Sequence, residues 1–150
     1  MANIFNVARY ILRKQKNITA MKLEKLCYYA QAWTLVWDEK PLFEEKIRAW
    51  TKGPVCPDLY DWHRGEFIVT ENDKLNSLCS KAELDEREKK NIDNVLNSYG
   101  EYTAQELSDL THKEEPWKEA TKHTTPEQSG EITLSMMHEY YSNLPEQYEL

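Results

Sequence analysis

Apolar residues near the start of the chain recur with the period of an α-helix, at i, i+3, i+4, i+7 and i+8: Ile4, Val7, Ala8, Ile11 and Leu12. Asn3 is suited to cap the start of this helix because its side chain accepts from free backbone amides, and Asn17 is suited to end it. The pattern predicts an amphipathic helix between these two residues.

A second helical stripe begins after Thr19, a suitable N-cap, and contains Leu23, Leu26, Cys27, Ala30, Trp33, Thr34 and Trp37. The other side of the same helix carries Tyr28, Tyr29 and Val36, so most of its circumference is apolar. A helix of this kind lies in the middle of a core. Pro41 limits its continuation.

The period changes to two beyond Pro41, which indicates a strand. Gly53 and Pro54 end this strand. Residues 67–70 are β-branched or aromatic, and we expect them to pair with residues 47–50 in a small sheet. The two sides of the first strand are formed by Phe43, Ile47 and Ala49 and by Lys46, Arg48 and Trp50.

A short helix is expected between the two strands. Pro57 suits a first helical turn, where its missing amide hydrogen is not needed, and Gly65 suits a helix end. These signals predict a helix over residues 57–64. Residues 71–80 are polar and are expected to form a loop.

Capping boxes predict two further helices. Ser80 with Glu83 fits the pattern in which the hydroxyl accepts from a backbone amide and the carboxylate reaches back. Thr103 with Glu106 repeats it. The first helix is expected to end at Gly100 and to turn inward Leu84, Ile92, Val95, Leu96 and Tyr99.

The last part of the chain continues this alternation of short helices and breaks. The helix of the second box is expected to end near Thr111, and Pro116 to begin another turn. Residues 121–130 read as a hydrophilic loop. Thr133 is suited to cap a last helix, which Pro145 closes and which carries Leu134, Met137, Tyr140, Tyr141 and Leu144.

These elements predict a mainly α protein, a compact single-domain helical bundle with a small antiparallel β-sheet of two or three short strands. The chain has 150 residues and only four glycines, which suits one helical domain over residues 1–150. No internal repeat, low-complexity tract or long linker divides it.

Charge is distributed unevenly along the chain, whose formal net charge is −7. Residues 1–37 hold six Lys or Arg against one acidic residue, and residues 38–150 hold 13 against 25. The acidic part disfavours non-specific nucleic-acid binding and favours a basic partner. The alternative interpretation is that these charges keep the surface soluble.

Cysteine usage indicates a reducing compartment. Cys27, Cys56 and Cys79 are odd in number and form no C-x-x-C pair, which fits neither a disulfide framework nor a zinc site. The start of the chain lacks the pattern of a signal peptide, and no apolar run reaches 18 residues. We expect a cytoplasmic protein with no membrane partner.

No constellation of residues points to catalysis, so we expect no catalytic residue, cofactor or metal site, and no enzyme. The strongest candidate is His112 acting as a general base toward Cys27 or Cys56, although a histidine in this setting more often fixes a helix end. Glu114 and Glu115 are adjacent acids that point in different directions, and we expect both to be solvated.

Tryptophan is abundant, and it is a frequent anchor of protein interfaces. Trp33 and Trp37 follow the helical stripe and are expected in the core. Trp50, Trp62 and Trp117 stand near turns or element ends and are the candidate partner-binding residues.

Three segments together carry a family resemblance: LEKLCYYAQAW (residues 23–33), AWTKGPVCPDLY (49–60) and ELSDLTHKEEPWKEA (106–120). In order and spacing they resemble the Panacea domain, also described as a phage-associated protein family, over most of the chain from about Ile4 to Tyr141. The signature positions are Lys25, Leu26, Tyr28, Tyr29, Trp33, Trp50, Gly53, Pro54, Val55, Tyr60, Leu107, Ser108, Thr111, His112, Pro116 and Trp117.

The resemblance implies an antitoxin of a bacterial or phage toxin-antitoxin system. Members of the family are encoded beside a toxin and neutralise it by direct protein contact, and the same domain is paired with unrelated toxins. A signature shared among different partners is expected to specify folding rather than contacts. Cys27 and Cys56 stand where bulkier aliphatic residues are common in the family.

Structural roles for the signature residues follow from the resemblance. Gly53 and Pro54 are expected to set a turn. Trp50 and Trp117 are expected to fill the core. Thr111, with the His112 beside it, is expected to tie a helix end to its neighbour by hydrogen bonds.

The function that we expect is therefore neutralisation of a cognate protein toxin, with no small-molecule ligand. The alternatives are a nucleic-acid-binding regulator that uses the first two helices and a short hairpin, an enzyme that uses Cys56 or Cys27 with His112, and an adaptor that delivers a bound partner to a protease. The oligomeric state and the binding face are open at this point.

Overall fold

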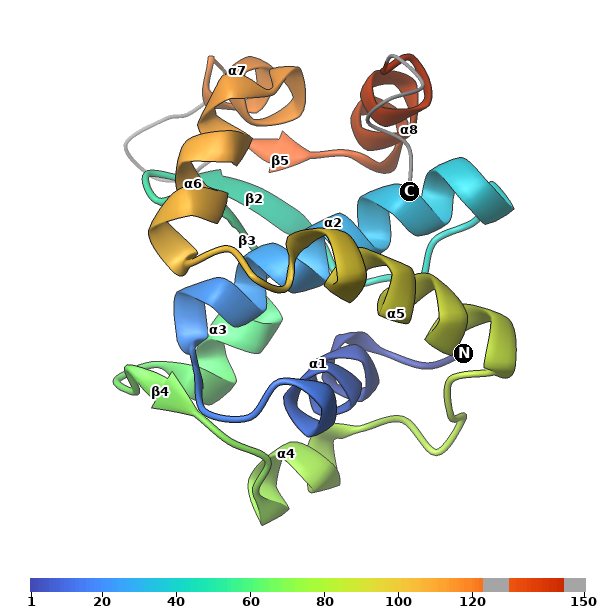
Figure 1. Ribbon diagram of the computed structural model, residues 1–150, viewed down its shortest axis with the longest axis vertical. Coiled ribbons are helices and arrows are strands. Elements are labelled where there is room, and N and C mark those ends of the chain that lie inside the picture. Colours follow the sequence, from blue (N-terminus) through green and yellow to red (C-terminus); the bar gives the residue numbers. More distant parts are fainter. Residues whose placement is uncertain (123–129, 145–150) are drawn as a thin grey trace.

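The structure, a computed structural model, describes residues 1–122 and 130–144 (Figure 1). It is mainly helical with two small antiparallel sheets, so the predicted fold class is confirmed. In chain order the elements are α1 (Ile4–Lys14), β1 (Ile18–Thr19), α2 (Ala20–Asp38), β2 (Ile47–Trp50), β3 (Gly53–Val55), α3 (Pro57–His63), β4 (Ile68–Val69), α4 (Asp73–Leu78), α5 (Glu86–Tyr99), α6 (Ala104–Lys113), α7 (Glu115–Thr121), β5 (Glu131–Ile132) and α8 (Leu134–Ser142).

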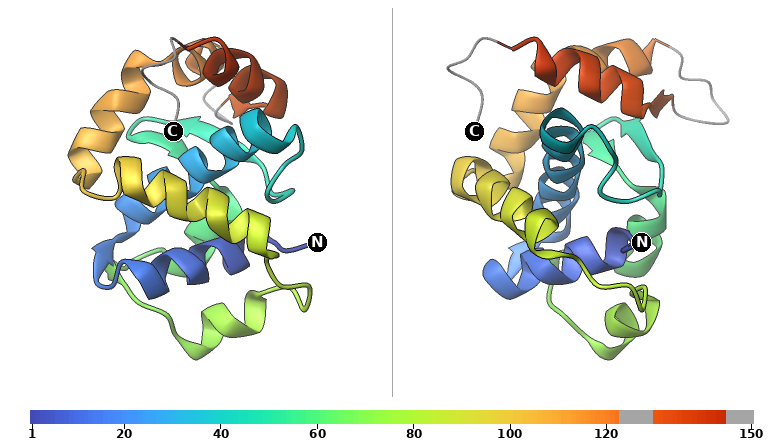
Figure 2. Two further views of the ribbon diagram at one scale, coloured as in Figure 1. Left: turned by 45° about the vertical axis from the view of Figure 1, so that its right-hand side comes forward. Right: turned by 90° about the vertical axis from the view of Figure 1, so that its right-hand side faces the viewer.

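α2 runs through the middle of the molecule, and the other elements pack around it (Figures 1 and 2). Its neighbours include α1, α5, α6 and α8 and the strand β3. Leu26, Tyr29 and Trp33 have no exposed surface. A helix that is apolar around most of its circumference is stable only when it is covered on every side, and the predicted central position of this helix is confirmed.

Four helix starts are confirmed by their caps. The side chains of Asn3, Thr19, Thr103 and Thr133 each accept from a backbone amide in the first turn of the helix that follows. Thr103 also forms the expected two-way capping box, in which the carboxylate of Glu106 accepts from its backbone amide. Each cap satisfies amides that have no partner within the helix itself.

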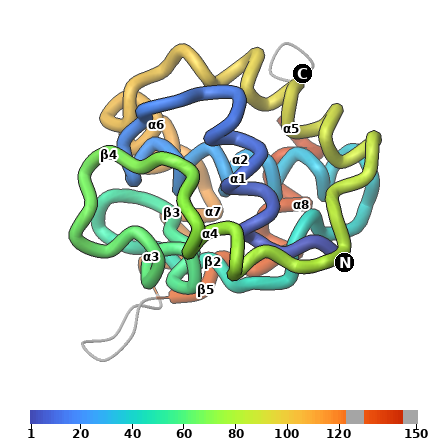
Figure 3. Tube along the Cα trace, turned by 90° about the horizontal axis from the view of Figure 1, so that it is seen from below, coloured from blue at the N-terminus to red at the C-terminus, as the bar shows by residue number. Residues whose placement is uncertain are grey.

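The loop predicted over residues 71–80 is wrong, because it contains α4. Asn72 caps this helix by accepting from the backbone amide of Leu75 at 2.8 Å. Leu75 is fully buried, and α4 packs on α1 at one end of the molecule (Figures 1 and 3). One buried leucine in a largely polar segment is enough to hold a short helix when a neighbouring helix covers it.

The predicted start of the next helix at Ser80 is also wrong. α5 begins at Glu86, where Asp85 and Glu88 form the capping box instead. The backbone amide of Ser80 donates to the side chain of Asn6 at 3.0 Å, so this residue is held against α1 outside any helix. α5 still ends before Gly100, as predicted.

The predicted pairing of residues 67–70 with residues 47–50 is wrong. β2 pairs with β3 on one side and β5 on the other, whereas β4 pairs with β1. Gly53 has a φ of +119°, which lets the chain reverse and pair Gly53 with Trp50 at once. One edge of β2 is therefore occupied by its nearest neighbour in sequence.

Most of the predicted loop 121–130, and the predicted closing residue Pro145, lie outside the described residues. Thr121 is the last residue of α7. Within the part of the chain that the structure describes, no helix is long and apolar enough to cross a membrane.

We predict that Gly53→Ala lowers the free energy of unfolding by about 2–4 kcal/mol, because it combines backbone strain with a steric clash. A Cβ on Gly53 would lie 2.6 Å from Cε of Lys25 and 3.0 Å from Oγ1 of Thr111. Urea denaturation followed by circular dichroism measures the loss.

Gly65→Ala is the matched control. Gly65 has a φ of +91°, but nothing lies within 4 Å of the added Cβ, so only the backbone strain of about 1–2 kcal/mol remains. Equal losses in the two variants would contradict the prediction, because the contact with Lys25 would then contribute nothing.

Candidate functional site

The three segments that carry the family resemblance meet beside the hairpin of β2 and β3. The indole Nε1 of Trp117 donates to the carbonyl oxygen of Trp50 at 2.8 Å, and Oγ of Ser108 donates to the carbonyl oxygen of Lys52 at 2.7 Å. Lys25 of α2 packs against the same hairpin. We call these five residues the hairpin cluster. It joins α2, α6 and α7 to one strand pair.

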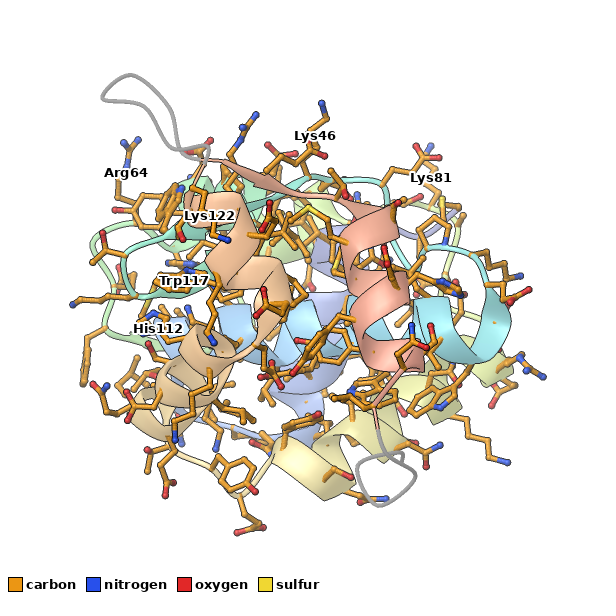
Figure 4. The ribbon with its side chains drawn as sticks, turned by 90° about the horizontal axis from the view of Figure 1, so that it is seen from above. Lys46, Arg64, Lys81, His112, Trp117 and Lys122 are labelled. Carbon is orange, nitrogen blue, oxygen red and sulfur yellow. The ribbon has the colours of Figure 1, made fainter. Side chains whose placement is uncertain are left out.

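The hydrogen bonds expected from Thr111 and His112 to a neighbouring element are not the ones that form. Oγ1 of Thr111 donates to the carbonyl oxygen of Ser108 within its own helix. His112 uses its ring face, because its ring packs on that of Trp117 with centroids 4.0 Å apart (Figure 4). Its Nε2 is buried with no hydrogen-bond partner among the described residues. Hydrogen bonds to the neighbouring hairpin are made by Ser108 and Trp117 instead of Thr111 and His112.

Most of the other signature residues lie inside the protein, which agrees with a folding role. Pro54 is buried in β3, and Pro116 is buried in the first turn of α7. Tyr60 is half-buried. The remaining buried members are Leu26, Tyr28, Tyr29, Trp33, Val55 and Leu107.

Lys25 is a fully buried cation without a carboxylate partner in the described structure. Within residues 1–122 and 130–144, its Nζ has the sulfur of Met21 as its hydrogen-bond partner, at 3.9 Å. Burial lowers the pKa of the Lys25 ammonium to about 8, since an apolar environment disfavours the charged form; nearby Glu24 opposes this effect and Lys52 adds to it. Its charge therefore costs stability at neutral pH.

The tryptophans divide between the core and the surface. Trp33 is fully buried and donates to the hydroxyl of Tyr99 at 3.0 Å, and Trp37 packs on the core, as predicted for both. Trp50 and Trp117 are only half-buried, so the expectation that they fill the core is met in part.

The three candidate partner-binding tryptophans are connected by ring contacts and one hydrogen bond. Trp50 meets Tyr60 edge to face at 4.9 Å between centroids, and Tyr60 meets His63 in the same way at 5.3 Å. His63 in turn contacts Trp62, and Trp117 adjoins Trp50 through its hydrogen bond. All three tryptophans are half-buried, which leaves part of each ring available.

The expectation that Glu114 is solvated is wrong. Its carboxylate is buried, and its Oε1 accepts from the hydroxyls of Tyr29 at 2.8 Å and Tyr141 at 2.7 Å. Burial raises the pKa of Glu114, and the two tyrosine hydrogen bonds oppose that rise. Glu115 is exposed, as expected. The two adjacent acids do point in different directions, and the side chain of Glu114 points into the core.

Sequence reasoning missed a second buried carboxylate. Oε2 of Glu24 lies 2.7 Å from Nε2 of His63, and Oε1 accepts from the backbone amide of Cys56 at 2.8 Å. Burial raises the pKa of Glu24, while the bonds from His63 and Cys56 oppose that effect. An acid in a helix that is apolar around most of its circumference was the available signal.

The cysteines have the properties of packed thiols. Cys27 and Cys56 are buried, and burial raises the pKa of the Cys56 thiol to about 12 and that of Cys27 well above its ordinary value. Among the described residues no group of three potential metal ligands comes together. Glu114, Tyr29 and Tyr141, whose pKa values burial raises, bond to one another inside the fold.

We predict that Glu114→Gln reduces the pH dependence of stability. A raised pKa means that the folded protein binds more protons than the unfolded chain between about 4.3 and the folded pKa, so stability falls as pH rises through that window. The amide keeps an acceptor for both tyrosines and removes the charge. Unfolding in urea across this pH range, for both proteins, measures the difference in slope.

Glu115→Gln is the control for Glu114→Gln, because it makes the same change at an exposed neighbour. It is expected to leave the slope of the wild-type protein unchanged. Parallel pH profiles for wild type and Glu114→Gln would show that burial does not perturb this carboxyl group.

We also predict that Lys25→Met raises the free energy of unfolding at pH 7 by about 1–3 kcal/mol, since each pKa unit corresponds to about 1.4 kcal/mol. A lysine whose pKa falls to about 8 binds fewer protons when folded than when unfolded, so wild-type stability rises with pH from about 8 to about 10.4. The advantage of the variant must shrink over that range. A difference in the free energy of unfolding between variant and wild type that stays constant from pH 7 to pH 10 would contradict the prediction.

One family matches this chain in comparison with known proteins. The family model described as antitoxin SocA-like, Panacea domain, matches residues 23–118. This is narrower than the expected range from Ile4 to Tyr141, and it leaves α1 and α8 outside. No curated protein and no solved structure matches the chain. Because the matched region is more than half of the chain and contains the whole hairpin cluster, the chain belongs to the family of SocA-like antitoxins with a Panacea domain.

Proposed function

We propose that this protein is the antitoxin of a toxin-antitoxin pair and neutralises a cognate protein toxin by direct binding, not as an enzyme. The family match over residues 23–118 is the observation that carries the proposal. The buried ionisable groups support it, because Glu24, His63 and Glu114 bond to core partners. The surface is left for recognition.

Neutralisation needs an interface that covers a surface essential to the toxin. About 1,600 Å² of total buried area is the usual size of a specific interface, and a few anchors supply most of its energy. The half-buried Trp50, Trp62 and Trp117 remain candidates for such anchors. The excess of acidic residues after Trp37 suits a toxin with a basic surface, because opposite potentials speed association.

The nucleic-acid-binding alternative has less support. It requires the first two helices to expose a face to a DNA groove, together with a short hairpin. β2 and β3 do form a hairpin after α2, but α2 is buried along most of its length. The protease adaptor differs only in the fate of the bound toxin, so it shares the binding step of our proposal.

The cysteines bear on the cellular compartment in which we propose that the protein acts. Cys27, Cys56 and Cys79 are all free thiols, two of them buried. This state suits the reducing cytoplasm. We therefore propose a cytoplasmic antitoxin.

Co-expression tests the proposal. The protein encoded by the neighbouring reading frame is expected to arrest growth when induced alone, and this chain is expected to restore growth and to co-purify with it at a fixed stoichiometry. An empty vector is the control. Arrest that this chain does not relieve, or relief without a complex, would reject neutralisation by binding.

The amount of toxin in rescued cells separates the two binding mechanisms. Direct neutralisation leaves the toxin present in the complex. An adaptor lowers the toxin level in a protease-dependent way. Immunoblotting with and without the cellular ATP-dependent proteases distinguishes them.

A further inference from the structure

α7 and α8 enclose a groove on the face of the molecule seen in Figure 4. Its volume of about 450 Å³ lies within the range of roughly 300–1,000 Å³ that is usual for binding clefts. Both helices are fixed from behind, since α8 packs on α2 while α7 packs on β2 and β5. We call this feature the α7–α8 groove. It is lined by Glu115, Pro116, Glu119, Met136, Glu139, Tyr140, Asn143 and Leu144.

The apolar lining on the α8 side is a helical ridge. Met136 and Tyr140 are spaced at i and i+4 on α8, and Leu144 follows just beyond the end of the helix at Ser142. All three are half-buried. Met137 and Tyr141, one position further along, are the residues that α8 buries in the core. α8 therefore has one fully buried apolar ridge and a second beside it that packs against the core and also lines the groove.

Acidic side chains border the apolar ridge from both helices. Glu115 and Glu119 belong to α7, Glu139 belongs to α8, and all three are exposed. Lys122 forms a surface ion pair with Glu119 at 3.2 Å, which compensates only part of this negative charge. The α7–α8 groove thus combines an apolar ridge with a negative border.

The charge of the groove decides between its possible occupants. The parts of the chain outside the described residues, 123–129 and 145–150, contain three Glu and no Lys or Arg, so they do not complement it. A partner segment with an apolar ridge flanked by Lys or Arg does complement it. A helical partner also fits, because the ridges of one helix pack into the grooves of another.

We infer that the α7–α8 groove is the toxin-binding site and receives a basic amphipathic helix of the toxin; this inference rests on the proposed function. Pro116 anchors one wall in the region matched by the family, whereas the α8 wall lies outside residues 23–118. The groove therefore lies across the boundary of the matched region, with part of its α7 wall inside it and its α8 wall outside. Met136 adds an adaptable thioether surface, which suits recognition of a specific apolar ridge.

Charge reversal in the purified full-length chain tests the inference. Glu139→Lys is expected to weaken binding of the neighbouring-frame protein at least 10-fold, measured by isothermal titration calorimetry at low salt. Raising the salt from about 50 to about 500 mM should narrow the gap to wild type, since exposed charges are screened. Glu66→Lys makes the same change at an exposed position far from the groove, and should alter the affinity less than 2-fold.

A second variant tests the apolar ridge without loss of the fold. Met136 occupies the third position of α8, where its sulfur accepts from the backbone amide of Thr133. Met136→Gln retains an acceptor for this capping box while making the ridge polar. It is expected to weaken binding about 10-fold, with a thermal unfolding midpoint close to that of wild type.

The outcomes separate the inference from the proposed function. If wild type forms the complex and restores growth while Glu139→Lys and Met136→Gln bind equally well, the groove assignment is overturned and the antitoxin function stands. If wild type neither binds nor restores growth, both fail. If the chain alone sediments as a dimer that Glu139→Lys dissociates, the groove holds a second copy and the inference is overturned.

Discussion

The burial of α2 on all sides is the constraint on which the rest of the structure depends. A buried polar group without a partner costs about 1–3 kcal/mol, and three polar side chains of this helix avoid that cost by bonding to other elements. Glu24 bonds to His63 of α3, Gln31 accepts from the amide of Leu42 and donates to the carbonyl oxygen of Phe43, and Tyr29 bonds to Glu114.

These bonds give the polar side chains of α2 their partners, and they also fix the positions of the elements around α2. α3 is held by Glu24, the segment before β2 by Gln31, and the junction of α6 and α7 by Tyr29, because Glu114 caps both of those helices. Trp33 adds a bond to Tyr99 at the end of α5. Directional bonds from one central helix thus determine an arrangement that hydrophobic burial alone would leave loosely specified.

The sequence allowed the helices to be predicted where the signal is local, and it failed where the decision is made by distant residues. The caps at Asn3 and Thr103 act within three residues, so their patterns were sufficient. Ser80 and Asp85 both begin acceptable capping boxes, and the choice between them depends on Asn6, which is 74 residues away from Ser80. Strand partners are non-local in the same sense, as the two-residue strands β1, β4 and β5 carry almost no pattern of their own.

The candidate site was also predicted only where the signal is local, because contacts with distant residues decide which of its side chains are buried. Residue type singled out the tryptophans, but it could not show that Glu114 is buried while Glu115 is exposed. The last helix was expected to carry Met137, Tyr140, Tyr141 and Leu144 without division into faces, whereas the structure buries Met137 and Tyr141 in the core and places Tyr140 and Leu144 in the lining of the groove. Tyr141 is fixed by its bonds to Tyr28 and Glu114, so these hydrogen bonds hold α8 through its fully buried ridge. Side chains of the other ridge can therefore change the shape and polarity of the α7–α8 groove without disturbing the bonds that hold α2, which is how one interior can support surfaces suited to different partners.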